Sequence, residues 1–477
     1  MKGLIRCAIA GSFTVAALAV VYIQLLLTPA RTTFEGIIFV SREPVDLKSV
    51  FVQNESGAFR FYYDYEDGGY VVDDIPPHIV DFDVFVGFMS NSARIAALRR
   101  IPSRDEELHG FGLNPPSATV EIEFLDGEVL KLNIGGIERV SGHYFVAVEG
   151  FDDVYIIPRG IAGQFLLPKT QIISQLVTPP LELSSPLSAI RDITFAGGGL
   201  KQPVAIYATA GASGEVALAA LSFGASTHIL RSAATYQLDQ AYGIQILGSL
   251  FEISAIDVVG YGLSDEEIAA LGFDQPYMAI EYDMINGVGV EERRMSLRFA
   301  RAEDGFFYAT LDDSGVVYLI DRKPFLDIQY DRLLLRWFLT PLLMDLSSVT
   351  VVLPDESRRF DIDASDPRNP TVYYNGDALD ISLFHAFFRL ITSAAHDGNY
   401  LGSLNPPQDE QPALTILYEY VNPEKQPDVM TFFPGGVRRA NVFINDVGEF
   451  AMRDIFVQRV REGTENLIAG SPIEENW

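Results

Sequence analysis

The sequence predicts an α+β protein made of three tandem related units behind one N-terminal transmembrane helix. Three observations lead to this prediction: an uncharged apolar run near the N-terminus, a turn motif that recurs three times, and alternating apolar residues after each copy. Each unit is expected to contain a strand hairpin, a helix and an antiparallel four-strand meander. We place the repeat units at residues 32–180, 181–330 and 331–462, the third being shortened, and expect 463–477 to form a flexible tail.

Residues 1–31 are expected to form a short cytoplasmic tip followed by a membrane anchor. Residues 7–30 carry no charge, and about 20 apolar residues span a bilayer core. Because Lys2 and Arg6 precede this run, the bulk of the chain is expected on the periplasmic side of the inner membrane. The alternative is secretion after cleavage of a signal peptide, since Thr28-Pro29-Ala30 has small residues at suitable positions. However, the apolar run exceeds the roughly 7–15 residues usual in such peptides.

The composition excludes several classes of function. The 477 residues include 64 acidic and 35 basic side chains, which gives a formal net charge of −29. Such a field repels phosphate, so neither duplex nucleic acid nor an anionic lipid surface is expected as a partner. Cys7 is the only cysteine, which excludes a disulfide framework and a cysteine-based metal site.

A turn motif recurs three times and is expected to open an alternating strand in each copy. The copies are Gly112-Leu113-Asn114-Pro115-Pro116, Gly272-Phe273-Asp274-Gln275-Pro276 and Ser403-Leu404-Asn405-Pro406-Pro407. After the first copy, Ala118, Val120, Ile122 and Phe124 alternate with polar residues. A period of two with one apolar face is typical of a half-buried strand.

The continuation after each motif matches as well, with an aromatic residue near the end of each meander. Tyr155 follows Asn114 by 41 residues, and Tyr318 follows Asp274 by 44. Phe450 follows Asn405 by 45. We assign an architectural role to a signature made of Gly112, Asn114, Pro116, Tyr155, Gly272, Asp274, Pro276, Tyr318, Asn405, Pro407 and Phe450.

Helices are expected upstream of the first meander. Apolar residues at helical spacing extend over residues 79–97. A second helix is expected to start at Ser103, because Glu106 stands three residues later and completes a capping box.

The second repeat shows the same arrangement, and the third shows part of it. An apolar helix is expected near residues 239–259, followed by a capping box of Ser264 and Glu267. In the third repeat an apolar helix is expected around Phe387, with no capping box after it. We therefore interpret the third repeat as a shortened copy.

The first copy resembles a bacterial family, the domain of unknown function numbered 4340. The similar residues are Phe111-Gly112-Leu113-Asn114-Pro115-Pro116-Ser117-Ala118-Thr119-Val120, Asp126-Gly127, Gly142-His143-Tyr144-Phe145-Val146 and Val154-Tyr155. The second copy departs from the pattern at Gln275 and Tyr277, and the third at Ser403. The resemblance implies a single-anchor, extracytoplasmic repeat protein, and some such proteins are encoded near transport systems of the ATP-binding-cassette (ABC) type. It implies no catalytic residues.

The sequence shows no familiar catalytic or metal-binding pattern. It contains neither Gly-x-Ser-x-Gly nor Ser-x-x-Lys, and its six histidines form no short ligand pair. We therefore assign no catalytic residue, cofactor or metal. Residues 361–366 begin like a calcium loop, but Asp366 stands where glycine is needed and Val372 where a bidentate Glu is needed. A weak divalent-cation site remains an alternative to an acidic turn.

These observations predict a non-enzymatic interaction or scaffold protein, which the family resemblance makes an accessory of an ABC-type transport complex. Its expected partners are the membrane and membrane transport subunits. One alternative is a cell-surface binding module for a glycan or small solute, suggested by an aromatic strip of Phe59, Phe61, Tyr63 and Tyr65. The other alternative is a hydrolase with a carboxylate site between units.

Overall fold

The structure is a computed structural model that describes residues 36–64, 69–102, 105–224, 226–285, 287, 291–312, 314–366 and 368–477. The chain divides into two compact units, the N-terminal unit Met1–Ser174 and the C-terminal unit Gln175–Trp477. The anchor expected in residues 1–31 lies outside the described residues. Within the described ranges, no helix combines the length and the apolarity that crossing a membrane requires.

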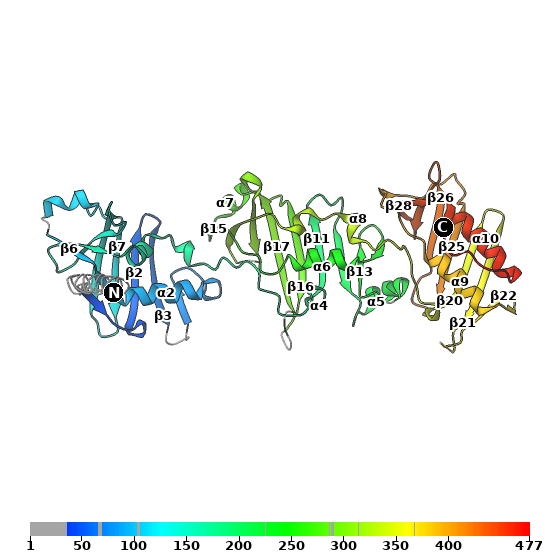
Figure 1. The fold of residues 1–477 in the computed structure, drawn as a ribbon, viewed down its shortest axis with the longest axis horizontal. Helices are drawn as coiled ribbons and strands as arrows, with labels where there is room; N and C mark the ends of the chain where they lie inside the picture. Colours follow the sequence, from blue (N-terminus) through cyan, green and yellow to red (C-terminus); the bar gives the residue numbers. More distant parts are fainter. Residues whose placement is uncertain are drawn as a thin grey trace, which may run out of the picture. The chain divides into compact units, whose positions relative to one another are not determined.

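The N-terminal unit is built on an eight-stranded antiparallel sheet (Figure 1). Its strands lie in the order β4-β3-β2-β7-β8-β9-β10-β6, while β1 and β5 pair in a separate two-stranded sheet. The strands are β1 (Ile37–Ser41), β2 (Leu47–Asn54), β3 (Gly57–Asp64), β4 (Gly69–Val72), β5 (Arg94–Ala97), β6 (Arg99–Ile101), β7 (Ala118–Phe124), β8 (Val129–Ile137), β9 (Tyr144–Val148) and β10 (Val154–Ile157). The α-helices are α2 (Phe82–Ser92) and α3 (Arg159–Ala162).

The C-terminal unit contains two nine-stranded antiparallel sheets, in the orders β14-β13-β12-β11-β16-β17-β18-β19-β15 and β23-β22-β21-β20-β25-β26-β27-β28-β24. The strands of the first are β11 (Ile190–Gly197), β12 (Val204–Ala208), β13 (His228–Arg231), β14 (Thr235–Gln237), β15 (Asp257–Tyr261), β16 (Met278–Met284), β17 (Arg293–Arg301), β18 (Phe307–Leu311) and β19 (Val316–Ile320). Those of the second are β20 (Leu346–Leu353), β21 (Glu356–Asp363), β22 (Thr371–Tyr374), β23 (Asp377–Ala378), β24 (Tyr400–Leu404), β25 (Leu414–Tyr420), β26 (Asp428–Pro434), β27 (Arg439–Ile444) and β28 (Val447–Arg453). The helices are α4 (Pro186–Ala189), α5 (Gly214–Ala220), α6 (Gln240–Gly248), α7 (Asp265–Ala270), α8 (Tyr330–Leu333), α9 (Ile381–Thr392) and α10 (Ile455–Ala469).

The three large sheets share one topology, which confirms a repeat-like α+β architecture. In each sheet the first long strand (β2, β11 or β20) pairs on one side with its hairpin partner and on the other with the first meander strand. The first meander strand alternates buried and less buried residues in all three sheets. In β7 the alternating residues Ala118, Val120, Ile122 and Phe124 are at most 2% exposed. The sequence alternation therefore builds the same half-buried sheet three times.

Helix α2 covers a core face of the first sheet. Asp81 caps the helix, since its carboxylate accepts a hydrogen bond from the backbone N–H of Val84 at 3.0 Å. The Phe61 ring stacks on the Phe88 ring of α2 with 3.9 Å between centroids. Because Phe59 and Phe61 are 3% and 0% exposed, the first half of the aromatic strip belongs to the core, whereas Tyr65 lies outside the described residues.

Two expected helices are shorter than the apolar patterns that predicted them. Within residues 79–97, α2 covers only Phe82–Ser92, and Arg94–Ala97 form β5, which pairs with β1. Near residues 239–259, α6 ends at Gly248, and β15 follows and pairs with β19. Strand pairing satisfies the backbone of these apolar segments as well as a helix would, so apolar spacing alone did not locate the helix ends.

The short helix expected after each of these segments differs among the three repeats. Residues 105–111 form a 3-10 helix, and Ser103 lies outside the described residues. The capping box of Ser264 and Glu267 is present at the start of α7. Between β24 and β25 of the third sheet, within residues 405–413, no helix occurs.

The C-terminal end of the chain packs against the third sheet's helix α9 (Figure 1). Residues from Gly463 onward were expected to form a flexible tail, but α10 continues to Ala469. A Cβ added at Gly463 would lie 2.9 Å from Leu390 of α9, so the two helices are in close contact. The Trp477 indole N–H then donates to Ser393 Oγ at 2.7 Å. The apolar face of α10 therefore completes the core of the third sheet.

Candidate functional site

The first two copies of the turn motif lie at equivalent places in their sheets. Asn114 and Asp274 each stand four residues before the first meander strand. Gly112 and Gly272 have φ angles of 68° and 90°, a region that favours glycine. A Cβ at Gly112 would also lie 2.8 Å from the backbone nitrogen of Gly136. Pro116 and Pro276 follow in the same turns, so this part of the signature shapes the chain at strand entry.

The third copy of the motif lies elsewhere relative to its strand. Asn405 directly follows β24, with Pro407 two residues later, and β25 begins only at Leu414. The motif thus precedes its strand by nine residues instead of four. The sequence similarity of the third copy does not correspond to an equivalent turn, because an insertion separates it from the strand.

Tyr155, Tyr318 and Phe450 occupy the same position in the three sheets. Each pairs with the preceding meander strand on one side and with the closing edge strand on the other. Their exposed fractions are 4%, 4% and 1%. The Tyr155 ring packs edge-on against Phe39 at 4.8 Å between centroids. The aromatic side chain at this position is therefore buried in the core of every repeat.

The residue before Phe450 is a buried carboxylate at the contact between the second and third sheets. Glu449 of β28 is 0% exposed, and its Oε2 accepts a hydrogen bond from the Tyr330 hydroxyl of α8 at 2.9 Å. Tyr236 of β14 is a further hydrogen-bonding neighbour. Burial raises the pKa of Glu449, while the tyrosine hydrogen bonds act in the opposite direction.

An aromatic cluster surrounds this carboxylate. The Phe450 ring stacks on His396 at 4.4 Å and meets the Tyr236 ring edge-on at 5.8 Å. His396 is 3% exposed, and burial, aided by Arg336, lowers its pKa to about 4. The imidazole is therefore neutral at physiological pH, and the cluster holds one buried acid without a buried cation against it.

A second buried carboxylate lies at the same sheet contact. Asp428, at the start of β26, is 2% exposed. Its Oδ2 accepts from Ser222 Oγ at 2.5 Å and from the Tyr420 hydroxyl at 2.6 Å. Its Oδ1 accepts from Lys425 Nζ and from Asn445 Nδ2, each at 3.0 Å. Ser222 comes from the second repeat and the other partners from the third, so Asp428 ties the two repeats together.

Ser222, Lys425, Asp428 and Asn445 are among the residues that line a cavity of about 200 Å³ between the second and third repeats. A serine, a lysine and an aspartate around a cavity are the components of many hydrolytic sites. An ionised carboxylate has about four acceptor positions, and all four on Asp428 are engaged by protein donors. The arrangement can hold the two repeats together, but it leaves this carboxylate no position to accept a proton from a substrate or a water.

Neither Glu449 nor Asp428 can be recognised as a site residue from a sequence motif. Among 64 acidic residues neither is distinctive by type or spacing. One signal was available for Glu449, which stands alone among the apolar and small residues of Gly448-Glu449-Phe450-Ala451-Met452. A strand buried on both faces with one acid in it indicates a buried carboxylate that needs donors.

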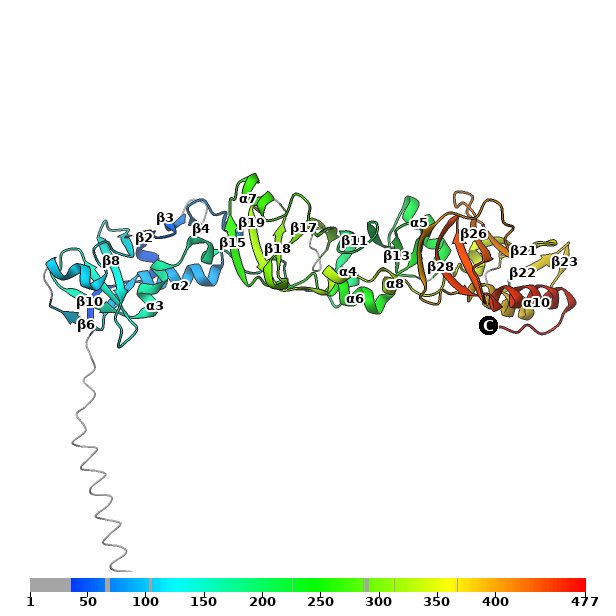
Figure 2. The same cartoon turned by 90° about the horizontal axis from the view of Figure 1, so that it is seen from above.

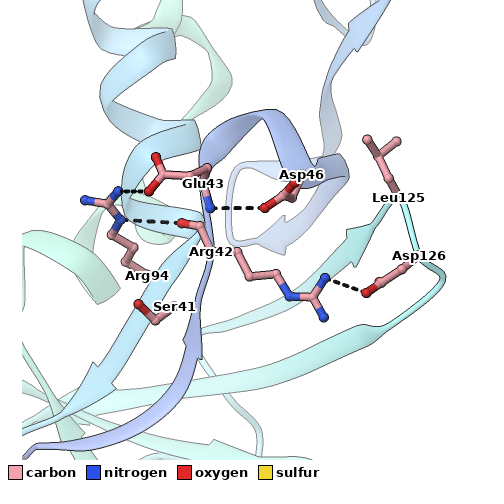
Figure 3. A pocket seen from close by; sticks show the side chains of 7 residues that line it. All are labelled: Ser41, Arg42, Glu43, Asp46, Arg94, Leu125 and Asp126. Carbon is pink, nitrogen blue, oxygen red and sulfur yellow. Dashed lines mark hydrogen bonds and ion pairs between the residues drawn. The ribbon is translucent and has the colours of Figure 1, made fainter.

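The N-terminal unit has an open pocket of about 610 Å³ where the two-stranded sheet meets the β7–β8 turn (Figure 3). Arg42 Nη1 lies 2.6 Å from Asp126 Oδ2, and Arg94 Nη2 lies 2.7 Å from Glu43 Oε1. Arg42 also pairs with Glu128. The hydrogen bond from Arg42 holds the pKa of Asp126 below its ordinary value. Both arginines are thus neutralised by local carboxylates, and such exposed pairs contribute little stability.

The remaining candidate sites have local structural roles. In the acidic turn Asp361 pairs with Arg359 at 2.8 Å, and Asp363 accepts from the backbone N–H of Ser365 at 3.0 Å. Asp366 accepts from the backbone N–H of Arg368 at 3.1 Å. In the part of the chain that the structure describes, no three metal-ligating side chains gather into a group that could hold an ion.

No family model, no curated protein and no solved structure matches the chain.

Proposed function

We propose that the protein is a membrane-anchored, extracytoplasmic interaction or scaffold protein without catalysis of its own. In this role it acts as an accessory of an ABC-type transport complex. The anchor is inferred from the uncharged residues 7–30, and the transport link from the resemblance at residues 111–155. The repeated sheets support the proposal, because repeat proteins commonly use several similar surfaces for binding partners.

The proposal that the protein is not an enzyme rests on the hydrogen bonds that the Asp428 carboxylate accepts. This carboxylate lies beside a cavity, 2.5 Å from Ser222 Oγ and 3.0 Å from Lys425 Nζ. A general base needs a free acceptor position within hydrogen-bond reach of the proton that it removes. Because four protein donors already hydrogen-bond to the Asp428 carboxylate, we infer that Asp428 connects the two repeats and does not act as a base in hydrolysis.

Glycan binding is less well supported by the aromatic strip. Phe59 and Phe61 do border a cavity of about 230 Å³ in the N-terminal unit. Their rings are buried under α2, so they offer no flat exposed surface on which a sugar could stack. The cavity is also smaller than the roughly 300–1,000 Å³ usual for ligand sites. A ligand screen that raised the melting temperature of the full chain would favour the binding-module alternative instead.

The proposal is tested by purification of the full-length protein from gently solubilised membranes. The matched control is a form that lacks residues 1–31. We expect stoichiometric recovery of integral-membrane transport subunits with the full-length chain. Recovery of the protein alone would contradict the accessory role.

The orientation is tested separately with intact spheroplasts. A protease added outside should digest residues 32–477, while a cytoplasmic marker protein stays intact. Complete protection of the chain would reverse the orientation inferred from Lys2 and Arg6.

A further inference from the structure

One end of the first sheet carries a cluster of exposed arginines and apolar side chains. The β8–β9 turn presents Arg139 beside Val140, whose side chain is 94% exposed. Arg99 opens the neighbouring edge strand β6, directly after Leu98, which is 41% exposed. Arg159 follows β10 at the same end of the sheet. We call Leu98, Arg99, Arg139, Val140 and Arg159 the basic patch.

The sheet pairing brings these residues together. Strand β10 lies between β9 and β6, and Ile156 of β10 pairs with both Phe145 and Arg99. Figure 2 shows β10 and β6 at this side of the N-terminal unit. The backbone N–H of Arg159 donates to His143 Nδ1 at 3.1 Å, which places α3 against the β8–β9 turn. The carboxylate of Glu138 lies near Arg99 and hydrogen-bonds to its own turn at Val140 and Ser141.

The charges of the patch are available to a partner. Arg99, Arg139 and Arg159 are all exposed, and among the residues that the structure describes none of them forms an ion pair. Glu138 faces Arg99 from the turn, so among the described side chains of this sheet end three arginines lie beside one acid, although the whole chain carries −29. The arginines of the open pocket in Figure 3 differ in this respect, because both are paired with carboxylates.

The patch also lies next to the point where the N-terminal segment enters the fold. Gly36 is in contact with Ala97, since a Cβ on this glycine would lie 3.0 Å from the Ala97 carbonyl oxygen. Ala97 is followed directly by Leu98 and Arg99 of the patch. Only residues 31–35 separate the apolar run from Gly36, and five extended residues span at most about 18 Å.

We propose that the basic patch of the N-terminal unit docks on the anionic lipid headgroups of the membrane in which the chain is anchored. This inference rests on the anchor of the proposed function. The short connection keeps the patch within reach of the bilayer surface at a high effective concentration. The arginines attract phosphate, and the exposed Val140 and Leu98 suit the apolar boundary below the headgroups.

The whole-chain charge had suggested that anionic lipid would be repelled. Such repulsion acts on a protein that approaches the membrane from solution, where its net field matters. Beyond a Debye length of about 8 Å at physiological salt, however, exposed charges are largely screened. For a tethered unit the surface nearest the bilayer decides the interaction, and that surface is the basic patch.

The test compares two equivalent hairpin tips in the full-length protein. Val437, in the β26–β27 turn of the third sheet, is 91% exposed and corresponds to Val140, but belongs to the repeat farthest from the anchor in the sequence. With Cys7→Ser as background, Val140→Cys and Val437→Cys each carry one environment-sensitive fluorophore. The proteins are incorporated into lipid nanodiscs of phosphatidylcholine, or of phosphatidylcholine with about one third phosphatidylglycerol.

We expect the label at position 140 to shift to the blue and to resist iodide quenching in the anionic discs, and the label at 437 to stay exposed. Replacing Arg99 and Arg139 with Gln should lower the ratio of docked to undocked label about fivefold for each arginine. Equal quenching at both positions in incorporated protein would overturn the docking proposal and leave the anchor intact. Failure of the full-length protein to enter the discs would overturn the anchor and the docking together. Protection at 140 that is equal in both lipids, or that requires an added protein, would also overturn lipid recognition.

Discussion

Replacing Glu449 with glutamine should remove a pH dependence from the stability of the C-terminal unit. The native carboxyl is fully buried, and its burial raises its pKa above the ordinary value of 4.5. In the unfolded chain the same group is in water and titrates near that ordinary value. As the pH rises through the interval between the two values, the unfolded state loses its proton first, so the native state loses stability.

The magnitude follows from the transfer of a single proton. Within that interval the slope approaches about 1.4 kcal/mol per pH unit, the free energy equivalent of one pKa unit. The side-chain amide introduced by Glu449→Gln cannot titrate, and its oxygen can still accept the Tyr330 hydroxyl hydrogen bond that Glu449 accepts at 2.9 Å. The wild-type protein should therefore lose stability relative to Glu449→Gln as the pH rises from about 4.5, with most of the loss complete once Glu449 is ionised in both states.

The assay is urea unfolding of the full chain at closely spaced pH values, with tyrosine and tryptophan fluorescence as the signal. Glu465→Gln is the matched control, because Glu465 lies on an exposed position of α10. Its pH profile should follow the wild type. Parallel profiles for wild type and Glu449→Gln would refute the reasoning, because they would mean that Glu449 has the same pKa in the folded and unfolded chains.

Three further predictions concern stability. Tyr155→Ala should destabilise the N-terminal unit by about 3–5 kcal/mol, since the ring is 4% exposed and packs on Phe39; a loss below about 1 kcal/mol in thermal unfolding would mean that the ring is not a core residue. Ser264→Ala should cost about 1 kcal/mol, because it removes the capping box of α7, and an unchanged melting temperature would show that this cap contributes nothing. Gly135→Ala should lower soluble expression and the melting temperature, because a Cβ there would lie 2.4 Å from the Phe111 carbonyl oxygen; Gly127→Ala is the control for an uncrowded turn, where only the positive φ of 90° opposes the change.

The similarity of the repeats in the sequence comes from residues with local roles. Gly112 and Gly272 adopt positive φ angles, and the alternation that begins at Ala118 buries one face of a strand. Both constraints act over a few neighbouring residues, so they leave a pattern that can be recognised without the structure. The three meanders and their aromatic anchors at Tyr155, Tyr318 and Phe450 were predictable for this reason.

The ends of helices and the assignment of edge strands were less predictable. Residues 94–97 continue an apolar helical spacing, yet they form a strand because β1 supplies a hydrogen-bonding partner. That partner lies more than 50 residues away in the chain, so no local sequence pattern indicates the pairing. The same reason explains why the C-terminal residues were expected to fray, since α10 and Trp477 are held by α9 and Ser393.

The sequence by itself determined the repeated half-buried strands, the strand-entry turns, the net charge and the uncharged N-terminal run, because each depends on residue type and short-range order. Only the tertiary structure decided which charges are buried, paired or free. Asp428 meets Ser222 across 206 positions of sequence, and Glu449 meets Tyr330 across 119. The arginines at positions 99, 139 and 159 share one sheet end only because β10 pairs with both β9 and β6. An acid or an arginine acquires its role from the groups that folding places around it, and those groups come from distant parts of the chain.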